Sequence, residues 1–215
     1  MGNRYIQLVK LDYLALSSYL KFLIIFFALG IVNALFDASG IMSIILISFI
    51  SNTIFQSYLF GAEGKYDLDR LYASLPVTNK DIVLSRYLSG LILSVEIYVP
   101  FVLLAIIIAV CNGQTSMLSG FLSMLGASYG LSLFFVSIEF PLLYRYGFTK
   151  VQFIQAIPFL IVMALIFLMR EFFNTDIISY LSLSPYFSVM VLVIGCVLFF
   201  ISFFIACRIR NKKLG

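Results

Sequence analysis

The sequence contains no histidine, and only 11% of its 215 residues are charged. Without histidine the chain cannot build histidine-ligated metal sites, a Ser–His–Asp triad or a histidine proton relay. Soluble domains carry about 25% charged residues, so roughly half of the usual charge is missing. The cysteines have no metal-ligand spacing and are interpreted as small packing residues, namely Cys111, Cys196 and Cys207.

Sequence motifs for chemistry are missing as well. There is no G-x-x-x-x-G-K-[ST] phosphate-binding loop, no H-E-x-x-H zinc motif and no aspartate-rich metal cluster. The polar stretches between apolar runs are too short to form a soluble domain. We therefore expect no catalytic site and no cofactor in this chain. If it moves a substrate actively, the energy must come from a partner protein or from an ion gradient.

Long apolar runs dominate what is present. Hydrophobic residues make up 62% of the chain, and the mean hydropathy is +1.09. Runs of about 18 or more apolar residues recur along the length, which is typical of transmembrane helices. A soluble globule needs a polar exterior and could not hide so much apolar surface. The sequence therefore predicts a multi-pass membrane protein. Because Arg4, Lys10 and Asp12 are spread through the first residues, we expect no cleavable signal peptide.

The apolar runs predict an all-α fold with six transmembrane helices in a single domain, residues 1–215. Residues 1–18 combine a polar stripe with a broad apolar surface, which favours a helix lying in the membrane interface. The alternative is that this segment simply extends the first span. Small residues between Gly120 and Gly130 have spacings that allow close helix approach. The expected spans are residues 19–36, 41–60, 87–110, 117–143, 152–169 and 183–207.

Positive charge orients the predicted helices. Six spans place both termini on one side of the membrane, and every Lys and Arg except Arg170 then falls on that same side. Cytoplasmic loops of membrane proteins are enriched in Lys and Arg. We therefore expect both termini to be cytoplasmic and the protein to lie in the plasma membrane.

The longest run of mixed charge is residues 61–86, which we predict to form a cytoplasmic loop. Gly61 and Gly64 are expected to break the second span as it leaves the membrane. Thr78 to Asp81 has the S/T-x-x-[DE] form of a capping box, and an apolar run follows it. The box therefore predicts the start of the third span.

A short amphipathic helix is expected inside this loop. Asp67 is a plausible N-cap for it, and Pro76 ends it. Acidic residues stand beside the basic ones, whereas a helix resting on an anionic leaflet is usually mainly basic. The pattern therefore favours docking to a protein over resting on lipid, which is the alternative. The apolar stripe of the helix consists of Leu68, Leu71, Tyr72 and Leu75.

Two segments resemble those of a known family. Residues 71–83 read LYASLPVTNKDIV and are followed by SRY, and residues 140–147 read FPLLYRYG. These segments resemble the SLP-[VI]-[ST] and P-L-x-x-[KR]-[FY]-G segments of ABC-2 type transporter permeases, and the order of features is similar along essentially the whole chain. Within that family, the small size is similar to that of permease subunits of Gram-positive exporters of cytolytic peptides, the phenol-soluble-modulin type.

The resemblance implies a bacterial permease that pairs with a second copy or a paralogue and binds two cytosolic ATPase subunits, which hold ATP and magnesium. Membrane lipid and an amphipathic peptide substrate are further implied partners, and no nucleic acid is expected. The loop 61–86 would hold the main ATPase-coupling helix, with a smaller contact at residues 144–151. The implied coupling residues are Asp67, Leu68, Leu71, Tyr72, Leu75, Pro76, Arg145 and Tyr146.

Other functions stay open at this point. A permease of the same kind could move lipids, drugs or a lantibiotic for self-protection. A membrane scaffold or sensor that transports nothing could use the loop to recruit a cytosolic partner. An ion-coupled carrier is disfavoured, because no second ionisable residue accompanies Glu96 deep in a predicted span.

Two acidic residues interrupt the predicted spans. Glu96 lies ten residues beyond Arg86, roughly 15 Å along a helix and near the middle of the membrane. An ionised side chain there costs at least about 2.5–3.5 kcal/mol, so we expect Glu96 to face the dimer interface or the translocation path. The alternative is a neutral, hydrogen-bonded carboxyl in the core. Glu139 lies about 9 Å from Arg145 along a helix. For this residue we favour the neutral, hydrogen-bonded carboxyl over a place at the dimer interface or the translocation path.

Overall fold

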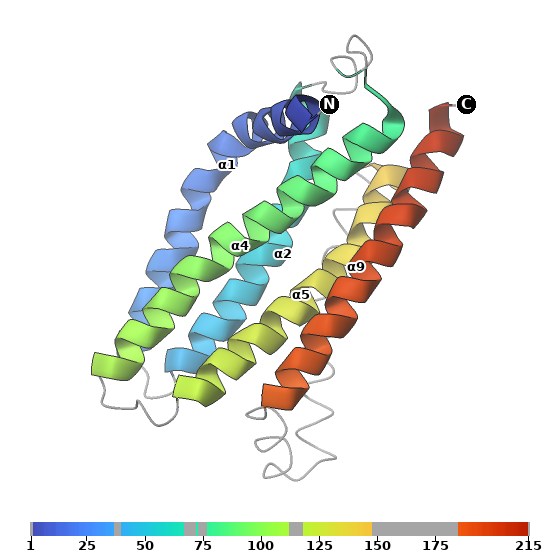
Figure 1. The fold of residues 1–215 in the computed structure, drawn as a ribbon. Coiled ribbons are helices and arrows are strands. Elements are labelled where there is room, and N and C mark those ends of the chain that lie inside the picture. The colour runs from blue at the N-terminus through green and yellow to red at the C-terminus, as the bar shows by residue number, and fades with distance from the viewer. Residues whose placement is uncertain are drawn as a thin grey trace.

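The computed structural model describes residues 2–36, 40–66, 72, 77–111, 118–147 and 185–214. Its elements are helices that pack side by side as a bundle, and α1 begins at the same end where α9 ends (Figure 1). The all-α prediction is therefore confirmed for these residues. The helices are α1 (Gly2–Phe36), α2 (Gly40–Tyr66), α4 (Asn79–Cys111), α5 (Leu118–Tyr146) and α9 (Pro185–Leu214).

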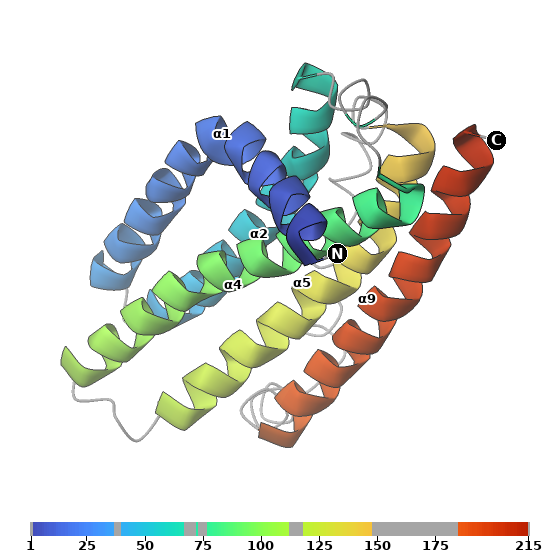
Figure 2. The same cartoon turned by 45° about the horizontal axis from the view of Figure 1, so that its top comes forward.

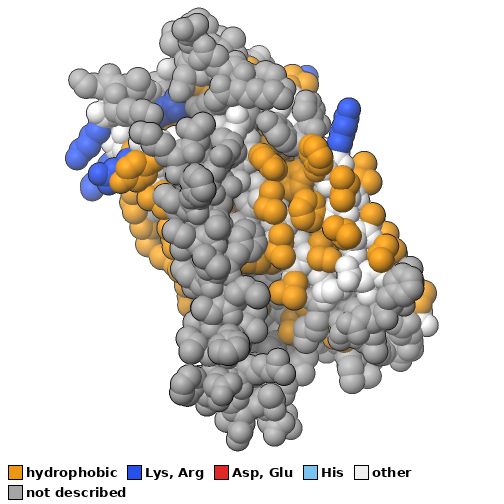
Figure 3. Space-filling view, turned by 180° about the vertical axis from the view of Figure 1, so that it is seen from behind, with side chains coloured by type: hydrophobic (Ala, Val, Ile, Leu, Met, Phe, Trp, Pro, Cys, Tyr) orange, Lys and Arg blue, Asp and Glu red, His pale blue; other side chains and the backbone are white. Residues whose placement is uncertain are grey.

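Four of these helices are long and apolar enough to cross a membrane, and α1 would make a fifth if its two segments count as one bent span. The four correspond to the predicted second, third, fourth and sixth spans. The predicted fifth span, residues 152–169, lies outside the described residues, so the number of six stays a prediction. On the face drawn in Figure 3, the visible Lys and Arg side chains gather near one end, and apolar side chains occupy most of the described surface.

Helix α1 is bent. Its segments Ile6–Leu16 and Lys21–Asn33 meet at 68°, and Figure 2 shows the first segment crossing in front of α4. Within the first segment Leu8, Asp12 and Leu16 are buried, and their spacing of four residues places them on one helix face. The sequence predicts this division into two segments. Whether the first segment lies in the membrane interface stays a prediction.

Helix α2 corrects one expectation. It continues through Gly61 and Gly64 to Tyr66, although both glycines were predicted to end it. Glycine lowers helix stability by about 1 kcal/mol relative to alanine, and tertiary packing readily outweighs that cost. Gly61 is buried, so this part of the helix is packed inside the bundle and does not depend on local propensity alone.

Buried polar side chains bond α2 to its neighbours on both sides. Asn52 Nδ2 donates to Ser132 Oγ of α5 at 2.9 Å. Gln56 Nε2 donates to the Gly90 carbonyl and to Ser94 Oγ of α4, both at 2.7 Å. Such interhelical bonds are worth about 0.6 kcal/mol each on average in a membrane protein. Helix α2 is thus the central helix that holds α4 and α5 together, a role that its apolar sequence pattern does not reveal.

Helix α4 starts as the capping box predicts. The Asp81 amide donates to Thr78 Oγ1 at 3.3 Å, and the Thr78 amide donates to Asp81 Oδ2 at 3.0 Å. The two residues therefore satisfy each other's backbone groups at the helix start, and the predicted capping box is confirmed.

Removing the cap should weaken the start of α4. We expect Thr78→Ala to lower the free energy of unfolding by about 1 kcal/mol, the usual effect of losing an N-cap oxygen. Thr78→Ser keeps the hydroxyl and should stay close to the wild type. Unfolding followed by circular dichroism in mixed micelles measures both variants. Equal stabilities for Thr78→Ala and Thr78→Ser would contradict the assignment.

Helices α5 and α9 approach each other very closely. A Cβ atom built on Gly195 would lie 2.4 Å from the Gly130 carbonyl oxygen, and one built on Gly130 would lie 2.7 Å from the Leu192 backbone. Only glycine leaves room for backbones at this separation. The close approach predicted from the small residues of this span is confirmed at Gly130.

Candidate functional site

A buried ion pair joins α1 to α4. Arg86 Nη2 lies 3.4 Å from Asp12 Oδ1, and the two side chains are 1% and 0% exposed. Taking two charges out of water costs several kcal/mol for each ion, and attraction offsets this only when further hydrogen bonds satisfy the remaining groups. The surroundings of this pair therefore decide whether it is stable.

Neighbouring groups supply those bonds. The Tyr72 hydroxyl donates to Asp12 Oδ1 at 3.0 Å, and Ser89 Oγ donates to Asp12 Oδ2 at 3.1 Å. Arg86 Nη1 donates to the Leu59 carbonyl, and Nη2 lies 3.4 Å from the Tyr72 hydroxyl. We call Asp12, Tyr72, Arg86, Ser89 and the Leu59 carbonyl the Arg86 network. It connects α1, the C-terminal half of α2, the loop residue Tyr72 and the start of α4.

Apolar packing closes the network from one side. Tyr72 is only 3% exposed and forms a small core with Leu8 of α1 and Ile82 of α4. The first segment of α1 therefore holds a residue of the predicted coupling loop against the start of the third span. A displacement of the loop at Tyr72 would have to move α1 and α4 with it, or break these bonds.

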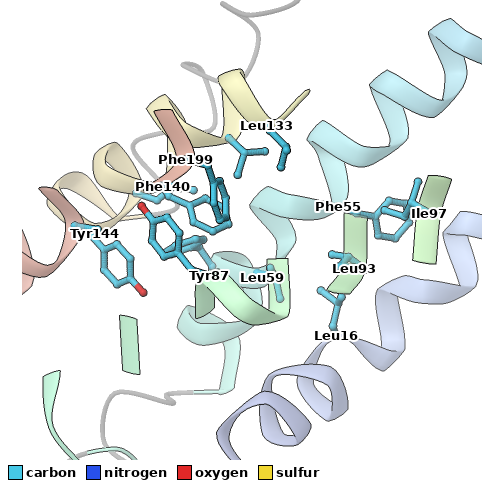
Figure 4. Close-up of a cluster of buried hydrophobic side chains, with 14 of the residues drawn as sticks. Leu16, Phe55, Leu59, Tyr87, Leu93, Ile97, Leu133, Phe140, Tyr144 and Phe199 are labelled. Atoms are coloured by element: carbon cyan, nitrogen blue, oxygen red, sulfur yellow. The ribbon is translucent and has the colours of Figure 1, made fainter. Parts of the chain in front are cut away.

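An aromatic cluster continues from the network into α5 and α9. The Arg86 guanidinium lies 5.2 Å from the centre of the Phe60 ring, and that ring lies 5.0 Å from the ring of Tyr144. The Arg210 guanidinium then stacks at 5.7 Å on Tyr144. Figure 4 shows the Tyr87, Phe140, Tyr144 and Phe199 side chains gathered in this cluster. The packed rings link the Arg86 network to the C-terminal ends of α5 and α9.

The second predicted coupling surface lies at the end of α5. Arg145 is exposed, and its guanidinium lies 5.2 Å from the centre of the Tyr146 ring, which is also exposed. Gly147 ends the helix with a φ of 79°, and its amide donates to the Leu143 carbonyl at 2.8 Å. This is the αL termination that glycine favours. A fixed helix end thus holds Arg145 and Tyr146 at the surface of the protein.

The predicted coupling residues divide into three groups. Arg145 and Tyr146 are accessible, as a contact surface requires. Tyr72 is buried, and it packs against Leu8 of α1 and Ile82 of α4. This differs from the exposed stripe expected of it, because its hydroxyl finds the Asp12 carboxylate. The remaining predicted residues lie outside the described part of the chain, namely Asp67, Leu68, Leu71, Leu75 and Pro76.

The two intramembrane acids have different surroundings. Glu139 is 4% exposed and lies inside the protein on α5. Glu96 is exposed on α4, and its Oε2 accepts a 2.7 Å hydrogen bond from the Tyr13 hydroxyl of α1. Its exposure is compatible with a dimer interface or a translocation path, and its depth in the membrane stays a prediction.

Sequence reasoning missed the centre of this site. It counted Arg86 as a loop cation and Asp12 as an ordinary charge of the first residues, whereas both are buried. The sequence signal that could have indicated its burial is the position of Asp12, four residues from both Leu8 and Leu16 and so on the same apolar face of α1. Within the described ranges no group of three or more His, Cys, Asp or Glu side chains could hold a metal ion. The arrangement is suited to transmitting movement between helices.

Comparison with known proteins identifies a family. The model of a family described as "ABC-2 family transporter protein" matches residues 7–211 of the chain. No curated protein and no solved structure matches it.

Proposed function

This chain belongs to the ABC-2 family of transporter proteins, and from that premise we propose that it is the membrane-spanning permease subunit of an ATP-driven exporter. Membership makes it a multi-pass membrane protein, which its apolar helices bear out. The family implies partnership with an ABC ATPase subunit. In the proposed complex two ATPase subunits bind ATP and magnesium in the cytosol, and the permease supplies the path across the membrane.

The Arg86 network is the observation that best supports a coupling role for the loop 61–86. It ties loop residue Tyr72 to α1 and α4 through the buried Asp12–Arg86 pair. An ATPase that pushes on this loop would therefore move two helices together. The aromatic cluster extends the same connection to Tyr144 and the neighbouring Arg145 and Tyr146. Both proposed ATPase contacts thus act on one packed body.

An amphipathic peptide is the cargo we propose, following the resemblance to cytolytic-peptide exporters. A lipid, a drug or a lantibiotic is the second candidate. The described rings near the network pack against one another, so the proposal of a peptide rests on the family resemblance.

Co-expression with a candidate ABC ATPase tests the coupling proposal. We expect the two proteins to co-purify, and we expect Arg145→Asp to lower recovery of the complex at least about tenfold, because an exposed cation at an interface is replaced by an anion. Lys10→Asp makes the same charge change at an exposed position of α1 and should leave recovery unchanged. A permease that never retains an ATPase would contradict the proposal.

The same complex in proteoliposomes tests the cargo. Cytolytic amphipathic peptides should raise its ATPase rate, whereas a scrambled peptide of low amphipathicity should not. A rate that responds to a lipid or a drug but not to cytolytic peptides would replace the peptide with that cargo.

A further inference from the structure

One exposed face of α4 is apolar except at a single position. The aliphatic side chains of this face are 42–58% exposed, and they follow one another at helical spacing, namely Ile92, Val95, Val99, Leu103, Ile107 and Val110. Glu96 lies among them and is exposed as well. Among the acidic residues whose burial is described, Asp12 and Glu139 are buried and Asp81 is half-buried, whereas Glu96 is exposed. We call this surface the Glu96 face.

Lipid alone is a poor cover for this face. A carboxylate among hydrocarbon chains costs a few kcal/mol, and the Tyr13 hydroxyl occupies only one of its oxygens. No described Lys or Arg lies within ion-pair distance of Glu96. Helix α9 offers a comparison, since most of its apolar stretch is not buried and residues 186–212 contain no acid at all. That surface suits lipid, whereas the Glu96 face calls for a cation.

A suitable cation stands on the neighbouring helix. Lys21 is exposed at the start of the second segment of α1, on a stripe that continues with the exposed Ile25, Leu29 and Val32. The two helices contact each other at matching levels, because the ring centroids of Phe27 and Phe101 lie 5.7 Å apart.

Lys21 and Glu96 therefore occupy similar levels of the bundle. Leu16 and Leu93 belong to one buried cluster and lie near each other in Figure 4. Lys21 follows Leu16 and precedes Phe27 on α1, while Glu96 follows Leu93 and precedes Phe101 on α4. A two-fold axis along the membrane normal brings residues of equal depth together. Lys21 of one copy can therefore meet Glu96 of a second copy.

We propose that the Glu96 face, together with the Lys21 stripe of α1, is an interface between two copies of this chain, in which Lys21 of each copy pairs with Glu96 of the other. This inference rests on the proposed permease function, because it names the surface through which the permease pairs. Two-fold symmetry forms the ion pair twice and removes both unmatched charges from lipid. Tyr13 then fixes the carboxylate through its second oxygen.

A second copy fits the face better than a cationic substrate does. The face is a continuous apolar stripe over much of α4, and a fixed helix surface matches such a stripe along its length. The complementary charge is already present on the chain at a matching level. A transported cation would require a site that empties in each cycle, whereas the Tyr13 bond holds Glu96 in place.

A charge exchange between two tagged copies tests the proposal in detergent, without any ATPase. Lys21→Glu homodimers and Glu96→Lys homodimers each contain two like-charged contacts, so we expect their co-purification with themselves to fall about tenfold or more. A mixture of the two variants restores both ion pairs, one with its native charges and one with the charges reversed, and should recover wild-type pairing. Lys10→Glu is the matched control, and it should pair normally with itself.

Cysteine cross-linking provides a second measurement if the charge variants fold poorly. In a background without Cys111, Cys196 and Cys207, Lys21→Cys and Glu96→Cys copies should cross-link to each other with a short bis-maleimide. Leu131→Cys, exposed on α5, should not cross-link to Lys21→Cys. Absence of the Lys21–Glu96 cross-link, or failure of the mixed variants to pair, would overturn the proposal. The same holds if Glu96→Gln leaves pairing intact but abolishes stimulation by a cationic peptide. If the mixed variants fail to pair while the chain still retains an ATPase, this interface is overturned and the permease function stands.

Discussion

Replacing Arg86 with methionine is expected to lower the free energy of unfolding by about 3–5 kcal/mol, the usual result of removing one partner of a buried ion pair. Asp12 would keep its place inside the protein, where its carboxylate is 0% exposed, and would lose the charge that compensates it. The Leu59 carbonyl would also lose its donor. Unfolding in mixed micelles, followed by the helical circular dichroism signal, measures the change.

A double variant separates the ion pair from the packing around it. Asp12→Leu combined with Arg86→Met removes both charges, and such replacements are often neutral or stabilising. We expect the double variant to regain most of the stability that Arg86→Met loses. Arg145→Met serves as the control, because Arg145 is exposed and its loss should change stability by less than about 0.5 kcal/mol. A double variant as unstable as Arg86→Met would show that the pair is not the source of the effect.

Recovered stability need not mean recovered transport. The double variant would keep the apolar packing of Tyr72 against Leu8 and Ile82 but would remove the carboxylate that receives the Tyr72 hydroxyl. If the Arg86 network transmits loop movement, the complex of the double variant with its ATPase should hydrolyse ATP with little response to substrate. A stable double variant with full stimulation would assign the network to folding alone.

Replacing Gly195 with alanine should lower the free energy of unfolding by about 3 kcal/mol, which is the upper end of what overpacking usually costs. The added Cβ would lie 2.4 Å from the Gly130 carbonyl oxygen. A backbone atom cannot turn aside as a flexible side chain can, so α5 and α9 would have to separate along their contact. We expect a lower yield of folded protein and a lower unfolding midpoint in mixed micelles.

Gly126→Ala is the matched control on α5. A Cβ at Gly126 would lie 3.6 Å from Ser188 Oγ, an ordinary van der Waals distance. Since alanine also favours helix by about 1 kcal/mol over glycine, this variant should be as stable as the wild type or slightly more so. Equal losses for Gly126→Ala and Gly195→Ala would mean that the close crossing at Gly130 does not limit the packing.

Local signals in the sequence predicted much of the fold. Hydropathy located four of the predicted spans within one to several residues of the helices α2, α4, α5 and α9. The capping box at Thr78 placed the start of α4, because its bonds join residues only three apart. Gly61 and Gly64 led to a wrong prediction of the end of α2, because a local signal does not report the tertiary packing around a residue. Their effect on α2 depends on what packs around them.

The candidate site was only partly predictable. Segment 140–147 pointed to Arg145 and Tyr146, which the structure exposes at a helix end. Tyr72 was selected for its place on an apolar stripe, but the stripe alone could not indicate whether a partner or α1 covers it. The main loop residues from Asp67 to Leu71 and from Ala73 to Pro76 lie outside the described part of the chain.

By itself the sequence determined the class of the protein, its family resemblance and the approximate places of most helices, because hydropathy, charge and capping act over a few neighbouring residues. The tertiary structure decided which polar groups meet. Asp12 and Ser89 are 77 positions apart in the chain, and only the bend of α1 across α4 brings them together with Arg86. Arg86 is buried and not a loop cation, and a buried charge must be paired inside the protein. It therefore joins the helices around it.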